Sequence, residues 1–103
     1  MRTSFCLAEQ DLVERTRYYA TAEDGHLADR FFVATIEAVR SAEDMPGIGS
    51  ALVGERIGIP ELRRVGVEGF PCGWFFFERS DHLDVVRLLA DEQDLDDLLG
   101  SEI

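Results

Sequence analysis

Hydrophobic residues follow two different spacings along this chain, first a helical period and then the alternation of strands. In residues 8–20 the apolar or small positions Ala8, Leu12 and Tyr19 fall on one side, which predicts a first helix. In residues 26–41 Phe31 and Ala38 belong to a stripe with helical spacing, which predicts a second and longer helix. Few residues join the two helices, so we expect an antiparallel helical hairpin.

Residues 59–89 read instead as three consecutive antiparallel strands. We expect the strands at 62–67, 72–79 and 83–89, with turns at 68–71 and 80–82, where glycine, proline, serine and aspartate gather. A further short strand is predicted at 2–7. Residues 46–58 contain four glycines and one proline, and there we expect a loop with at most a helical turn around Ala51.

The middle strand of this meander is apolar on both faces. Trp74 and Phe76 point to one face, and Phe75 and Phe77 to the other. A sheet of this kind is covered on both sides, and the helical hairpin can cover only one of them. For the other side two covers stay open: the acidic C-terminal segment, through Leu98 and its leucine neighbours, or another protein.

These elements predict a single α+β domain over residues 1–103. An N-terminal helical hairpin packs on a small antiparallel sheet of three to four strands, and a short C-terminal helix follows. With 46% hydrophobic residues, a chain of this length can bury a core without staples. We expect the cysteines Cys6 and Cys72, both in apolar runs, to be buried reduced thiols. A disulfide between them would need an oxidising compartment.

The charge of the chain argues against nucleic acid as a direct partner. The formal net charge is −11, and all ten basic residues are arginine. Residues 91–103 hold six acids and no base, so −5 remains for residues 1–90. Phosphate backbones would repel such a domain. Arginine still pairs with carboxylates in a planar, bidentate way, so Arg63, Arg64 and Arg87 are candidates for specific contacts.

Other classes of function find little support in the sequence. No stretch has the pattern of a secretory signal or the apolar length of a membrane span, so we expect a cytoplasmic protein. His26 and His82 have no second histidine or cysteine at ligand spacing, so we expect no metal site and no cofactor.

Several fragments of the sequence, taken in order, resemble those of the ParE branch of the RelE/ParE superfamily. The members of this superfamily are the toxins of type II toxin–antitoxin pairs. The resemblance covers nearly the whole chain. It rests on fragments in the first helix, the second helix, the loop, the meander and the C-terminal segment: Asp11-Leu12, Tyr18-Tyr19, Ala28, Phe31-Phe32, Pro46, Gly49, Leu62-Arg63, Gly69-Phe70-Pro71, Val86-Arg87-Leu88-Leu89, Asp94 and Leu98-Leu99.

The resemblance implies a toxin held by a cognate antitoxin of the ribbon-helix-helix, ParD-like kind, with DNA gyrase as the target and no chemistry of its own. Two alternatives stay open: a RelE-like ribosome-dependent mRNA endoribonuclease, and a detoxified relative that only forms the complex. The detoxified relative is suggested by Ala90-Asp91-Glu92-Gln93-Asp94, where family members usually carry bases. The predicted contacts to antitoxin or target are Arg63, Arg64, Trp74, Phe76, Arg87, Asp94 and Leu98.

Overall fold

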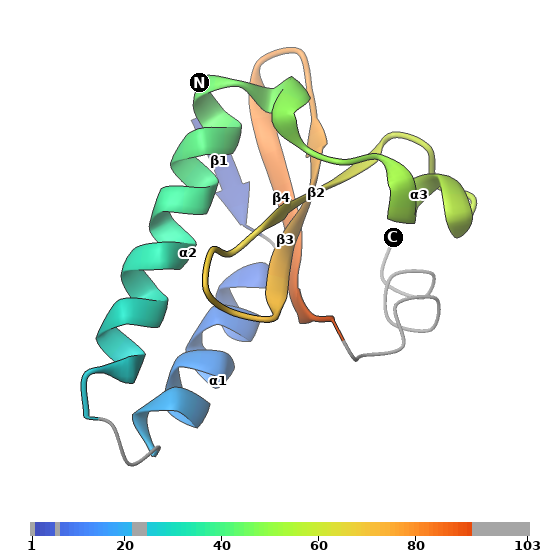
Figure 1. Cartoon of the computed structure of the whole chain (residues 1–103). Helices are drawn as coiled ribbons and strands as arrows, with labels where there is room; N and C mark the ends of the chain where they lie inside the picture. The colour runs from blue at the N-terminus through green and yellow to red at the C-terminus, as the bar shows by residue number, and fades with distance from the viewer. Residues whose placement is uncertain (1, 6, 22–24, 92–103) are drawn as a thin grey trace.

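The chain folds into a helical hairpin, a four-stranded sheet and a small third helix (Figure 1). The structure is a computed structural model and describes residues 2–5, 7–21 and 25–91. Its elements are β1 (Arg2–Phe5), α1 (Ala8–Ala20), α2 (Leu27–Asp44), the 3₁₀ turn η1 (Pro46–Ile48), α3 (Leu52–Arg56), β2 (Leu62–Gly66), β3 (Cys72–Glu78) and β4 (His82–Ala90).

The sheet has the strand order β1-β4-β3-β2. The predicted antiparallel meander of β2, β3 and β4 is confirmed, and the turn between β2 and β3 contains Gly69 at φ 84°, a conformation that favours glycine. The expectation of a wholly antiparallel sheet is wrong, because β1 pairs with β4 in parallel, from Arg2 opposite His82 to Phe5 opposite Val85. The long connection through the helices and the meander makes this parallel pairing feasible.

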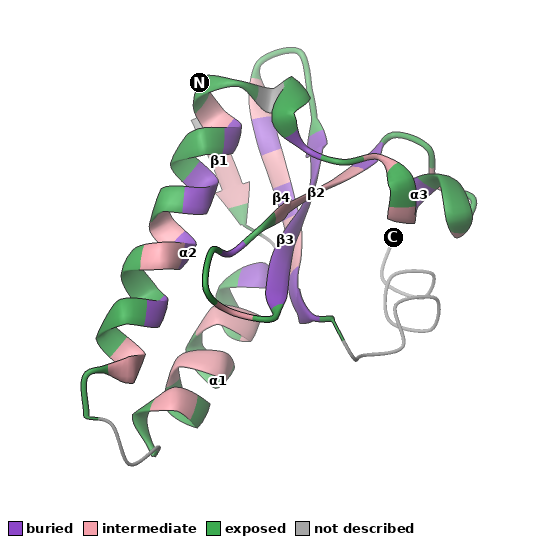
Figure 2. Cartoon of the chain, in the orientation of Figure 1, coloured by how far each residue is buried: buried purple, intermediate pink, exposed green. Residues whose placement is uncertain are grey.

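The larger part of the core lies between the helical hairpin and the sheet (Figure 2). Phe31 and Ala38 of α2 pack there with Trp74 and Phe76 of β3, as the alternation of the strand predicted. The indole nitrogen Nε1 of Trp74 donates a hydrogen bond of 2.9 Å to the backbone carbonyl of Thr35. The polar atom of the largest core side chain therefore has a partner in the helix that covers it.

The opposite face of the sheet carries a second core cluster, made of Leu62, Phe75, Phe77 and Leu89. Val53, Ile57, Ile59 and Val86 pack against this cluster, so α3 and the residues after it form part of its cover. The sequence indicated only a loop with a helical turn in this region. The predicted C-terminal helix, with Asp94 and Leu98, lies outside the described residues.

The predicted elements otherwise agree with the structure. The first helix has the expected bounds, and α2 runs three residues further, to Asp44. The ends of the three meander strands shift by at most one residue, and β1 ends at Phe5, two residues before the predicted end. Cys72 is buried as expected, and Cys6 is outside the described part of the chain. Within the described ranges, no helix is long and apolar enough to cross a membrane.

Candidate functional site

Two of the predicted contact residues, Trp74 and Phe76, belong to the interior of the protein. Each side chain is only 1% exposed, and both lie on the face of β3 that the helical hairpin covers. Neither offers surface to a partner while α2 stays in place. Their neighbour Phe75, on the other face, is equally buried.

Arg87 is held inside the protein by Asp11 of α1. Its Nε and Nη2 atoms lie 2.7 Å and 3.0 Å from the two carboxylate oxygens of Asp11, in a bidentate pair. The same carboxylate accepts the backbone N–H of Leu88 at 2.9 Å. Both charged side chains are 12% exposed, so this pair is largely withdrawn from water.

The local backbone explains why a carboxylate is needed at this position. β1 ends at Phe5, opposite Val85, so the later residues of β4 have no strand beside them on that side. A register shift also falls here, because Phe76 pairs with Val85 and Phe75 pairs with Arg87, which leaves Val86 as an extra residue. Such a bulge turns side chains in new directions. Asp11 therefore takes over part of the pairing that a strand would supply.

The other two predicted arginines lie on β2 and are also engaged within the chain. Arg63 donates from Nη1 to the carbonyl of Gly49 at 2.9 Å. The guanidinium of Arg64 lies over Gly73, where a Cβ atom would come within 2.7 Å of its Nε, and pairs with Asp91 at 2.6 Å. The side chain of Arg64 is 28% exposed and that of Asp91 56%, so a partner could reach this pair.

A polar cleft of about 260 Å³ lies between α1 and β4. Asp11, Glu14, Arg15 and Tyr18 line it from the helix, and Arg87 and Leu88 from the strand. Sequence reasoning selected Arg87 but not the helix residues beside it. Glu14, Arg15 and Tyr18 follow Asp11 by three, four and seven residues. This spacing places all four on one face of α1 and is the signal that could have grouped them.

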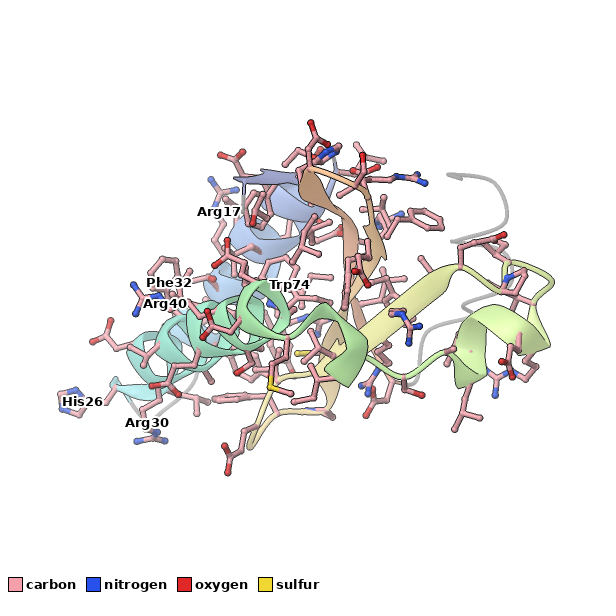
Figure 3. The ribbon with its side chains drawn as sticks, turned by 90° about the horizontal axis from the view of Figure 1, so that it is seen from above. Arg17, His26, Arg30, Phe32, Arg40 and Trp74 are labelled. Atoms are coloured by element: carbon pink, nitrogen blue, oxygen red, sulfur yellow. The ribbon has the colours of Figure 1, made fainter. Side chains whose placement is uncertain are left out.

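A second surface is formed by the side of the helical hairpin that faces away from the sheet. Figure 3 shows Arg17, Phe32 and Arg40 projecting from that side, whereas Trp74 lies toward the sheet. The side chain of Phe32 is 46% exposed, and that of Val13 on α1 is 45% exposed. This side of the hairpin thus combines apolar and cationic groups.

The described part of the chain contains no group of three or more histidine, cysteine or acidic residues arranged to hold a metal ion. His82 lies against its neighbour Asp81, with 2.6 Å between Nδ1 and the carboxylate. His26 is the residue before the first turn of α2.

Comparison with solved structures finds a similar fold. A chain in a structure titled "Chromosomal ParDE TA system from P. aeruginosa" superposes with a TM-score of 0.73 and 18% sequence identity, over 89% of this chain and 97% of that chain. The sequence matches no protein-family model and no curated protein. The two chains therefore share a fold, and the expected α+β class, a helical hairpin on a small sheet, is confirmed.

Proposed function

We propose that this chain is a ParE-like toxin of a type II toxin–antitoxin system. In this proposal a ribbon-helix-helix, ParD-like antitoxin neutralises it in the cytoplasm, and the free toxin binds and inhibits DNA gyrase. The fold shared with a chain of a ParDE system carries the proposal. Of the predicted contact residues, Arg64 has a partly exposed side chain, whereas Asp94 and Leu98 lie outside the described residues.

The state of the arginines supports a binding function over ribonuclease chemistry. Cleavage of RNA needs cationic groups free to stabilise a phosphorane-like transition state. Here Arg87 is committed to Asp11, Arg63 to a backbone carbonyl and Arg64 to Asp91. Each would have to leave an intramolecular acceptor before it could bind phosphate. The net charge of −11 further opposes the approach of RNA.

The test is controlled expression of the chain in bacteria, together with a supercoiling assay on purified gyrase. We expect growth arrest, a DNA-damage response and loss of supercoiling activity. Arg64→Gln should weaken inhibition about tenfold, as expected for the loss of one charged contact at an interface. Arg79→Gln is the matched control, because the Arg79 side chain is exposed and its Nη2 atom lies 3.7 Å from a carboxylate oxygen of Asp84.

Each alternative function has its own signature in the same experiment. New mRNA 5′ ends at codons after induction, with gyrase unaffected, would indicate a ribosome-dependent endoribonuclease. Normal growth and normal supercoiling in the presence of well-folded protein would contradict a toxin. That outcome would favour the third possibility, a detoxified relative of the toxins that only forms the complex with the antitoxin.

A further inference from the structure

The side of the helical hairpin that faces away from the sheet carries one row of side chains on each helix. Residues four positions apart are neighbours on a helix, so each row follows its helix for about two turns. Figure 3 shows Arg17, Phe32 and Arg40 on this side. We call the two rows the outer hairpin face, which consists of Glu9, Val13 and Arg17 on α1 and Phe32, Ile36 and Arg40 on α2.

The middle of the outer hairpin face is apolar and reaches water. Val13 and Phe32 are 45% and 46% exposed, and Ile36 is half-buried. The sheet lies on the opposite side of the hairpin (Figure 1), and the main core forms there. Apolar side chains that gather on the surface in this way are typical of a place where another protein docks.

The ends of the two rows carry charges that the fold does not use. Glu9, Arg17 and Arg40 are exposed, and within the described part of the chain no hydrogen bond or ion pair engages their side chains. The arginines of the sheet differ, because they bind acceptors inside the chain. The outer hairpin face has two arginines and one glutamate, whereas the whole chain has a formal charge of −11. An acidic protein, such as a second copy of this chain, is therefore not repelled at this face.

The order of the side chains along each row is self-complementary. When two copies of α1 cross antiparallel at Val13, each Glu9 lies opposite the Arg17 of the other copy. When two copies of α2 cross antiparallel at Ile36, each Phe32 ring lies opposite the guanidinium of Arg40, a favourable cation–π arrangement. Val13 and Ile36 both lie near the middle of their helices, and so at similar height in the hairpin. One two-fold axis therefore serves both rows.

We propose that the outer hairpin face binds a second copy of this chain across a two-fold axis at Val13 and Ile36. Each helix packs antiparallel against its own counterpart. Val13, Phe32 and Ile36 form the apolar centre of the contact, and the pairs of Glu9 with Arg17 fix its register. The inference goes beyond the proposed function and holds whether or not the chain is a toxin.

Sedimentation equilibrium of the purified full chain tests the pairing by exchange of charges. We expect the parent to form a dimer, and Arg17→Glu or Glu9→Arg to weaken association about tenfold, because each change places like charges opposite one another. Glu9→Arg also lowers the net negative charge, so general repulsion between copies cannot explain weaker association. The double variant Glu9→Arg with Arg17→Glu restores opposite charges and should regain the affinity of the parent. Arg56→Glu and Glu55→Arg, at exposed sites on α3, are the matched controls.

A cysteine at the proposed axis tests the position of the contact. In a Cys6→Ser background, where the remaining Cys72 is buried, Val13→Cys brings two thiols together across the axis. We expect this variant to oxidise to a covalent dimer, and Leu52→Cys, at an exposed site on α3, to stay largely unlinked.

Four outcomes would each overturn the inference. The first is a parent chain that stays monomeric up to about 1 mM, the range of the weakest specific complexes. The others are a double variant that associates no better than the single variants, equal weakening by the controls on α3, and equal cross-linking of Leu52→Cys and Val13→Cys. Because none of these measurements uses growth or gyrase, their failure leaves the proposed function untouched.

Discussion

At the scale of single residues, Asp11 connects two parts of the molecule that are far apart in the sequence. Its carboxylate accepts two hydrogen bonds from Arg87 and one from the backbone of Leu88. Two of the fragments that carry the family resemblance, Asp11-Leu12 and Val86-Arg87-Leu88-Leu89, therefore meet at one point. Arg87, which the sequence suggested for binding, acts first as a link between α1 and β4.

We expect Asp11→Ala to lower the free energy of unfolding by about 3 kcal/mol, because it leaves a nearly buried guanidinium and a strand N–H without their acceptor. Urea denaturation followed by circular dichroism measures this loss. Asp44→Ala, at an exposed site near the end of α2, is the control and should change stability by less than about 0.5 kcal/mol.

A double variant tests the reason for the loss. Arg87→Met in the Asp11→Ala background removes the unpaired charge and should recover part of the lost stability, because an apolar side chain can occupy the site without a partner. If Asp11→Ala lowers stability no more than Asp44→Ala does, the pair of Asp11 and Arg87 does not stabilise the fold.

At the scale of elements, the sequence predicts those with strong periodicity and misses the one that depends on distant contacts. The first helix and the three strands of the meander follow from spacing, because each shows its own apolar face. The five residues of α3 show no such face within their glycine-rich segment. Val53, Ile57 and Ile59 become apolar cover only when β2 and β3 present Leu62 and Phe77 to them.

The same limit applies to the candidate site. Arginines could be recognised as contact residues from the sequence, but their acceptors could not. The partner of Arg87 is 76 residues away in the chain, and that of Arg63 is a backbone carbonyl. Trp74 and Phe76 are large and apolar, which suggests binding, but both lie on the face of β3 that the helical hairpin covers.

Gly54 provides a test of how α3 is held. A Cβ atom there would lie 2.3 Å from the carbonyl oxygen of Ile59 and 2.6 Å from that of Leu62, and backbone cannot easily move away. We expect Gly54→Ala to destabilise the protein by about 2 kcal/mol, although alanine is the better helix former. Urea denaturation measures the loss, and binding of an apolar dye reports exposure of Phe75 and Phe77.

The matched control is Gly47→Ala in η1, where an added Cβ would meet no atom within 4 Å and the backbone conformation suits alanine. This variant should be neutral or stabilise the protein by about 0.5 kcal/mol, through the reduced freedom of the unfolded chain. Equal stability of the two variants would mean that α3 is not packed against β2 as the structure has it.

At the scale of the whole molecule, the protein has three layers: the helical hairpin, the sheet and α3. The helical hairpin covers one face, and α3 covers part of the other, so both faces of β3 are interior. The charges of the chain are strongly unbalanced, with 21 acidic and 10 basic residues. The apolar layers favour the compact state, while the repulsion among surface carboxylates opposes it.

This imbalance predicts how stability responds to salt. Surface charges repel one another over about 30 Å at 0.01 M ionic strength but only about 3 Å at 1 M. The thermal midpoint should therefore rise as sodium chloride is added, whereas a protein stabilised by surface ion pairs would lose stability. The pair of Arg64 and Asp91 works in the opposite direction, but a single partly exposed pair contributes less than about 1 kcal/mol.

A charge-reduced variant separates repulsion from general effects of salt on apolar burial. Glu9, Asp29, Glu55 and Glu61 are exposed, and converting all four to amides takes the formal charge from −11 to −7. The variant should melt at a higher temperature than the parent at low salt and gain less from added salt. Differential scanning calorimetry at several sodium chloride concentrations gives the slope of the thermal midpoint against salt for the parent and for the variant. If the slopes are the same, salt acts through burial of apolar surface, and carboxylate repulsion does not limit the stability of this fold.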